Sequence, residues 1–157
     1  MTTSQTPVVP LHAHEVPPRT ATAFPPEFAG CALGRERRPL GQAFGLSGLR
    51  VMLTRLAPSA RAVLLHAHSR EDEFIYVLEG VATLHTGTGP VRITAGMCAG
   101  LPAGTAHDLT NDGEVDVVLL EVGSRDPGDE VTYPEADLRA IPAASGYLFT
   151  HQDGSPY

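Results

Sequence analysis

Two histidines and a glutamate form the group of side chains in this sequence that is best spaced for chemistry. His66 and His68 stand two residues apart at the end of an apolar run, so the period of a β-strand puts both imidazoles on one face. Glu73 opens the next apolar run, and a hairpin between the runs returns its carboxylate to the imidazoles. His107 begins a later run after a Pro-Ala-Gly-Thr turn. Three neutral imidazoles and one carboxylate predict a site for one divalent transition metal, and this set accepts Fe, Mn, Ni, Co or Zn.

The other histidines have simpler explanations. Two of them form a His-x-His pair in a Pro-rich stretch without strand character, and two more stand beside turns or near the C-terminus, so we expect solvent-exposed side chains at His12, His14, His85 and His151. Glu71 and Asp72 are neighbouring acids that could be mistaken for the ligand. No further residue is identified as a catalytic acid or base, and no organic cofactor site is indicated.

The basic residues and the cysteines limit the possible chemistry. All 11 basic residues are Arg, which excludes a lysine Schiff base and a Walker loop. The arginines nearest the predicted site are Arg61, Arg70 and Arg92, which are candidates for gripping an anion, although surface charge is the simpler interpretation. Cys31 and Cys98 are far apart, so we expect no structural disulfide, and the apolar surroundings of Cys98 predict a buried thiol.

Charge and hydropathy also restrict the partners and the location. A net charge of -7 without a dense basic cluster disfavours nucleic acid as a partner. The longest aliphatic run, Val117–Leu120, is far shorter than a membrane span, and the N-terminus lacks a basic region followed by an apolar stretch. We therefore expect a cytoplasmic protein that binds a small molecule.

Short apolar runs bounded by Gly, Pro, Asn or Asp predict an all-β fold. Such closely spaced strands pair antiparallel, because parallel pairing needs crossover helices. A short helix is expected only after Pro134, over 135–139. The expected strands are Leu49–Leu56, Arg61–His68, Glu73–Leu78, Val81–Thr86, Val91–Thr94, Met97–Leu101, Ala106–Thr110 and Val115–Val122. We divide the chain into an extended or partly disordered arm (1–25), an N-terminal packing segment (26–48), the barrel (49–122) and a C-terminal extension that packs on the barrel (123–157).

These motifs resemble those of the cupin superfamily. The first runs from position 60 through His66, His68 and Glu73 to Gly80, and it departs from the family only in having Ala60 where the family has Gly. The second matches at every defined position: Gly96, Pro102, Gly104, His107 and Asn111. The resemblance implies a single jelly-roll barrel (double-stranded β-helix), usually dimeric, with the metal inside. Flanking segments such as Arg38-Pro39-Leu40-Gly41 and Asp126-Pro127-Gly128-Asp129 are similar to a subgroup of small bacterial cupins, some labelled sugar-phosphate isomerases.

Two classes of function are open to such a site. Four protein ligands leave two neighbouring metal positions free, which suits a metal-dependent isomerase or dioxygenase acting on a small oxygenated metabolite. The lack of Lys and the few Arg near the barrel weaken the sugar-phosphate version. A non-catalytic metal-bearing binding or sensor module is the alternative, and a titratable group in the cavity besides the ligands would discriminate against it. The intact ligand set argues against a barrel that has lost function.

Apolar residues before the barrel predict a second copy of the chain. Six of them need burial outside a barrel that is already complete: Phe24, Phe28, Leu33, Leu40, Phe44 and Leu46. An exchanged N-terminal arm would bury them and cover a sheet edge. We therefore expect a homodimer.

Overall fold

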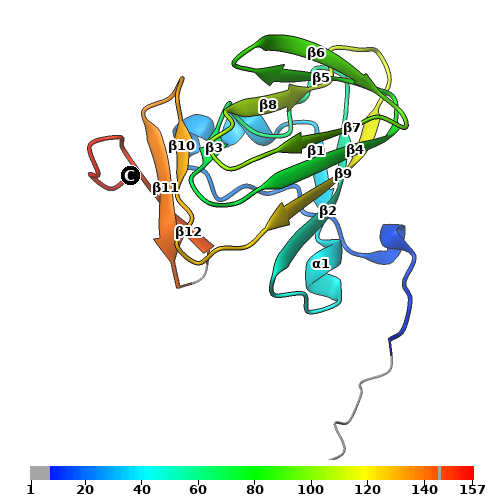
Figure 1. Ribbon diagram of the computed structural model, residues 1–157, viewed down its shortest axis with the longest axis horizontal. Helices are drawn as coiled ribbons and strands as arrows, with labels where there is room; N and C mark the ends of the chain where they lie inside the picture. The colour runs from blue at the N-terminus through cyan, green and yellow to red at the C-terminus, as the bar shows by residue number, and fades with distance from the viewer. Residues whose placement is uncertain (1–7, 145) are drawn as a thin grey trace, which may run out of the picture.

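A computed structural model describes residues 8–144 and 146–157, and its regular secondary structure is mostly β-strand (Figure 1). The helical elements are short: η1 (Ala13–Glu15), η2 (Pro26–Ala32) and α1 (Leu40–Ala43). The strands are β1 (Arg35–Arg38), β2 (Leu49–Leu56), β3 (Ala67–His68), β4 (Glu73–Glu79), β5 (Val81–Thr86), β6 (Gly89–Thr94), β7 (Cys98–Leu101), β8 (His107–Thr110), β9 (Val117–Ser124), β10 (Val131–Tyr133), β11 (Leu138–Ala143) and β12 (Gly146–Thr150). The predicted all-β jelly-roll class is confirmed.

Three antiparallel sheets make up the molecule. Their strand orders are β1-β2-β9-β4-β7, β6-β5-β8 and β12-β11-β10-β3. The first two sheets enclose a core of small and branched apolar side chains, among them Leu56, Val77, Leu109, Val117 and Leu119. Because alternate residues of β4 and β9 point inward, the same faces that build this core also carry the polar side chains of the site.

The segment from Arg61 to His68 does not form the single strand that its apolar run predicts. Arg61 and His66 form isolated bridges with β8, whereas Ala67 and His68 pair with β10. The chain therefore bends at residues 62–65 and then changes from one sheet to the other between His66 and Ala67. This bend places His66 and His68 at the junction of the two sheets.

The C-terminal extension is also more regular than its sequence suggests. The predicted helix over 135–139 is wrong, because residues 134–137 form the turn between β10 and β11. The strand β11 follows this turn, its residues alternate between buried and half-buried in its first part, and it pairs with β12. Sheet β12-β11-β10-β3 closes one end of the barrel (Figure 1).

The N-terminal arm packs on the rest of the same chain over its described part. Arg19 forms an antiparallel bridge with Arg37 of β1, and Phe24 and Phe28 pack against the apolar cluster of the C-terminal sheet. Leu33 and Phe44 stay exposed. Residues 1–7 of the predicted arm lie outside the described residues.

Two residues of the family motifs have structural roles. Gly80 has a φ of 81°, and a Cβ there would lie 2.6 Å from the Asp116 carbonyl oxygen, so no other residue fits this turn. Asn111 is fully buried, and its amide donates to the carbonyls of Leu56 and Val115 at 2.9 and 2.8 Å.

Within residues 8–144 and 146–157, no helix has the length and apolar character needed to cross a membrane.

Candidate metal centre

The four residues predicted as metal ligands converge inside the barrel. The Nε2 atom of His107 lies 2.8 Å from Glu73 Oε2, that of His66 lies 3.5 Å from the same oxygen, and that of His68 lies 3.7 Å from Glu73 Oε1. Ligand atoms of His66, Glu73 and His107 all lie within 4.8 Å of one another, and His68 stands beside them. All three imidazoles are buried. Three nitrogens and one carboxylate thus face a common point.

Each imidazole is held through its other nitrogen. The Nδ1 atom of His66 lies 3.0 Å from the Leu64 carbonyl, and that of His107 lies 2.9 Å from the Thr105 carbonyl. The Nδ1 atom of His68 lies 2.6 Å from Asp129 Oδ2. Because a carbonyl or carboxylate oxygen can only accept, Nδ1 carries a proton in each ring, and Nε2 is the nitrogen left for a metal once any proton shared with Glu73 is released. This is the tautomer that binds a metal through Nε2.

The pKa directions of the candidate ligands differ. Burial by itself lowers the pKa of His107, but its hydrogen bond with Glu73 outweighs burial and raises it. Burial lowers the pKa of His66, which favours the neutral imidazole. Burial by itself raises the pKa of Glu73, but hydrogen bonds with His107 and His66 and the charge of Arg50 outweigh it and hold that pKa well below its usual range. The set is therefore compatible with one divalent metal ion.

Arg50 reaches Glu73 across a glycine. Arg50 on β2 and Glu73 on β4 are both opposite Gly123 on the intervening strand β9. The Arg50 guanidinium crosses this position and forms an ion pair with Glu73. A Cβ on Gly123 would lie 2.8 Å from Arg50 Nη2 and 3.2 Å from Cζ, so the missing side chain leaves the path open.

Glu71 and Asp129 support the site from behind His68. The Glu71 carboxylate accepts a hydrogen bond from the Asp126 backbone at 3.0 Å and pairs with Arg50 at 3.4 Å. Asp129 is buried and accepts from the His68 imidazole, from the Arg70 backbone at 2.8 Å and from the Tyr147 hydroxyl at 2.8 Å. Both carboxylates are thus occupied by protein donors, and Glu73 remains the acid that faces the three Nε2 atoms.

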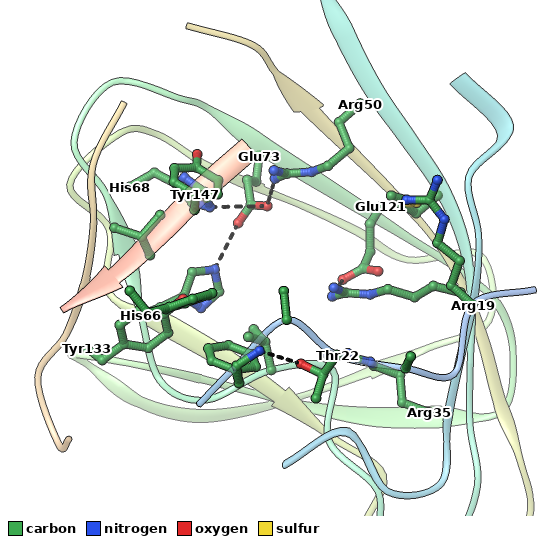
Figure 2. A pocket seen from close by; sticks show the side chains of 18 residues that line it. Arg19, Thr22, Arg35, Arg50, His66, His68, Glu73, Glu121, Tyr133 and Tyr147 are labelled. Atoms are coloured by element: carbon green, nitrogen blue, oxygen red, sulfur yellow. Dashed lines mark hydrogen bonds and ion pairs between the residues drawn. The ribbon is translucent and has the colours of Figure 1, made fainter. Parts of the chain in front are cut away.

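A cavity of about 270 Å³ opens next to these residues (Figure 2). Its lining includes His66, His68 and Glu73, and it also holds four arginines: Arg19, Arg35, Arg37 and Arg50. A smaller space of about 30 Å³, lined among others by His107, Arg37 and Glu121, continues beside the imidazoles. The expectation that few arginines lie near the site is therefore wrong. The three nominated from the sequence, Arg61, Arg70 and Arg92, are absent from the lining of the 270 Å³ cavity.

Comparison with known proteins identifies the family. The sequence model of a protein family described as Cupin domain matches residues 52–123. A sugar phosphate isomerase of the cupin superfamily from Silicibacter pomeroyi is 34% identical over 95% of this chain and 96% of that chain, with a TM-score of 0.89. The chain belongs to the cupin superfamily. No curated protein matches it significantly.

Two further structures are similar to this cupin over most of its length. A candidate sugar phosphate isomerase from Acidithiobacillus ferrooxidans is 29% identical over 78% of this chain and 80% of that one, with a TM-score of 0.70. A polyketide cyclase from Streptomyces resistomycificus is 17% identical over 76% and 80% of the two chains, with a TM-score of 0.62. The second likeness shows a shared fold alone.

Sequence reasoning missed the cupin's cavity residues that lie outside the two motifs. Arg35 and Arg37 alternate along β1 with residues that point outward. On β2, Arg50 points to the same inward face as Leu56, and the two-residue period of a strand predicts this from the sequence. Glu121 breaks the apolar run of β9 in the same way. Cys98 is exposed and Cys31 half-buried, both as free thiols, so the buried position predicted for Cys98 is wrong.

Proposed function

We propose that this cupin binds one divalent transition metal through His66, His68, Glu73 and His107 and isomerises a small oxygenated metabolite. The observation that carries the proposal is the convergence of three Nε2 atoms on one carboxylate, with each Nδ1 atom held by an acceptor. The metal is one of Fe, Mn, Ni, Co or Zn, since this ligand set accepts each of them. When bound, such an ion supplies Lewis acidity to a carbonyl or hydroxyl oxygen.

Glu121 is the residue that we assign to proton transfer. Its carboxylate lines both the 270 Å³ cavity and the smaller space beside the imidazoles. It accepts hydrogen bonds from the Thr54 hydroxyl and from Arg37, the latter at 3.1 Å. These contacts orient the carboxylate, so it is placed to take a proton from a substrate carbon and return it to a neighbouring one.

Two tyrosines line the same cavity. Burial raises the pKa of Tyr133, and burial together with the hydrogen bond to Asp129 raises that of Tyr147. Both hydroxyls therefore stay protonated near neutral pH. Titratable groups other than the metal ligands favour an enzyme over a binding or sensor module. The arginine-rich lining favours an isomerase of a polar, anionic compound over a dioxygenase of an apolar one.

Metal and turnover measurements test this proposal together. Purified protein is analysed for metal, stripped, reconstituted with each of the five ions, and assayed for aldose–ketose interconversion and for oxygen consumption. We expect one equivalent of metal and metal-dependent interconversion without oxygen uptake. Oxygen uptake with a metabolite would overturn the isomerase in favour of the dioxygenase, and ligand binding by the metal-loaded protein without turnover would favour the binding module.

Variants at Glu121 test its assigned role. Glu121→Gln keeps the shape of the side chain and removes the base, so kcat should fall at least 100-fold while the metal content stays unchanged. Glu114→Gln, an exposed change in a loop, is the control and should leave kcat within twofold. Loss of metal in Glu121→Gln would assign the residue to the metal site instead.

We also propose that this cupin forms a homodimer through the outer face of its five-stranded sheet. Ile75 and Val77 of β4 are buried, whereas Phe74, Tyr76 and Leu78 are 41%, 36% and 44% exposed on the opposite face. A row of exposed apolar side chains on one sheet face is suited to a second copy of the same face.

Light scattering tests the dimer. The full chain should be a dimer at micromolar concentration, and Tyr76→Glu should be monomeric. Truncation of residues 1–40 removes the edge strand β1 of the same sheet and the packing of Phe24 and Phe28, so it should give a monomer or an aggregate. Val115→Glu changes an exposed apolar residue in a turn and should leave the dimer intact. A monomeric full-length chain would contradict the proposal.

A further inference from the structure

The cavity has a second charged end, which is separate from the metal ligands. Arg35 and Arg37 stand two residues apart on β1, so both side chains point to the same face and line the cavity. Glu36 and Arg38 alternate with them and pair with each other at 2.8 Å. Arg19 lies beside this strand, because its backbone exchanges hydrogen bonds with Arg37 at 2.7 and 3.1 Å. All three arginines thus line the same cavity.

The positive charge at this end is not balanced by the protein. Arg37 pairs with Glu121 at 3.1 Å. Arg35 is only 7% exposed, and it donates to the Ala62 carbonyl but has no ion-pair partner among the described residues. The Nε atoms of Arg35 and Arg37 are buried without a hydrogen-bond acceptor. A buried cation without a counter-charge is costly, and a protein that retains one at the wall of a cavity gains from it only when an anion is bound.

Charge counting indicates which anion fits. Arg19 donates to the neutral side-chain amide of Gln42, so neither Arg19 nor Arg35 has a carboxylate partner in residues 8–144 and 146–157. With Glu121 balancing Arg37, this end of the cavity carries two uncompensated positive charges. A phosphate monoester carries close to two negative charges at neutral pH, whereas a carboxylate carries one. Guanidinium groups also match phosphate oxygens in a planar, bidentate geometry.

We propose that Arg19, Arg35 and Arg37 form a subsite for the phosphate group of a phosphorylated substrate. Figure 2 shows Arg19 and Arg35 on the side of the cavity opposite to His66, His68 and Glu73. A substrate held at both ends presents its phosphate to the arginines and its hydroxyl or carbonyl oxygens to the imidazoles. Resting on the proposed function, this inference narrows the metabolite to a short phosphorylated hydroxy-carbonyl compound that fits about 270 Å³.

Binding of simple anions tests the subsite without turnover. Isothermal titration calorimetry with the full chain, both stripped of metal and metal-loaded, measures inorganic phosphate, a pentose 5-phosphate, the matching pentonate and the unphosphorylated pentose. We expect the pentose phosphate to bind at least tenfold more tightly than the pentonate or the free pentose. Inorganic phosphate should bind with and without metal. A pentonate as tight as the phosphate would overturn the assignment to phosphate.

Arginine variants locate the binding. Arg35→Met should weaken phosphate binding at least tenfold, and Arg35→Lys should weaken it less, because it keeps the charge and loses the fork. Arg92→Met, an exposed change on β6, should leave binding within twofold. Since Arg35 is buried, circular dichroism checks that the Arg35→Met protein is folded. Arg19→Met changes an exposed side chain, should weaken phosphate binding about threefold, and provides a second test. Unchanged phosphate affinity in both Arg35→Met and Arg19→Met would overturn the subsite.

The outcomes also separate this inference from the proposed function. Arginine-dependent phosphate binding without any isomerisation would remove the isomerase and leave the subsite. Isomerisation of an unphosphorylated sugar, with no arginine-dependent phosphate binding, would remove the subsite and leave the isomerase.

Discussion

Replacing Gly123 with Ala should destabilise this cupin through a side chain on a neighbouring strand. The new Cβ would stand 2.8 Å from Arg50 Nη2, so the guanidinium has to leave its place between β2 and Glu73. A charge-assisted hydrogen bond contributes about 1.5–3 kcal/mol. The lower figure applies here, because Arg50 can keep its contact with Glu71. The reduced entropy of the unfolded chain returns about 0.5 kcal/mol.

The net loss is about 1 kcal/mol of unfolding free energy, which corresponds to a fall of about 2–4 °C in Tm for a protein of this size. Urea denaturation of metal-stripped protein measures it. Gly100→Ala is the matched control, since Gly100 also lies in a strand and a Cβ there meets nothing within 4 Å. In an Arg50→Ala background the cost of Gly123→Ala should vanish. An equal loss in both backgrounds would show that Arg50 is not the cause.

Three further perturbations address the metal ligands, their support and the buried arginine. His107→Ala should lower metal affinity far more than His12→Ala or His14→Ala, measured by competition with a chelator, because only His107 faces Glu73; equal losses would place ligands in the arm. Asp129→Asn should weaken metal binding about 10- to 100-fold by releasing His68, whereas the exposed Asp112→Asn should have no effect; an unchanged affinity would remove Asp129 from the support of His68. Burial, and then the charge of Arg37, lower the pKa of Arg35 to about 10, so the folded protein holds this proton less tightly than the unfolded chain does. The buried charge of Arg35 lowers the free energy of unfolding by its full amount below pH 10. This loss becomes smaller as the pH rises toward 12.5, because Arg35 deprotonates in the folded protein first. Urea denaturation from pH 8 to pH 11 should therefore show wild type gaining about 1 kcal/mol relative to Arg35→Met, and parallel curves would contradict the reasoning.

Spacing within single strands carried most of the fold prediction. The strand expected at Leu49–Leu56 is β2 residue for residue, and β5 likewise coincides with Val81–Thr86. These features depend on neighbours along the chain, and the sequence contains those neighbours directly.

The errors concern pairing between distant segments. The run from Arg61 to His68 has strand composition, but it serves two different sheets, and nothing local to the run records the exchange of partners. The turn at 134–137 has helical composition, but β11 and β12 bury their apolar residues only by pairing with each other and with β10.

The cavity was the hardest part to foresee. The four predicted ligands belong to two motifs that lie close together in the barrel, so their convergence could be predicted from the sequence. Arg35 was not recognised, since its neighbours in the cavity, such as Glu121 and Tyr147, come from positions that are remote in the sequence. An inward charged residue in an otherwise apolar strand phase is the signal that would have found Arg50 and Glu121.

The cavity is lined partly by the segment that matches the Cupin domain and partly by segments outside it. The barrel segment that matches the Cupin domain, 52–123, contains the candidate ligands and Glu121, whereas Arg19, Arg35, Arg37, Arg50, Tyr133 and Tyr147 all lie outside it. Two proteins can therefore share every motif residue and recognise different compounds. For proteins of this architecture, inferring the substrate of one relative from another requires comparison of the arm, β1 and the C-terminal sheet, because agreement across residues 52–123 covers only the candidate ligands and Glu121.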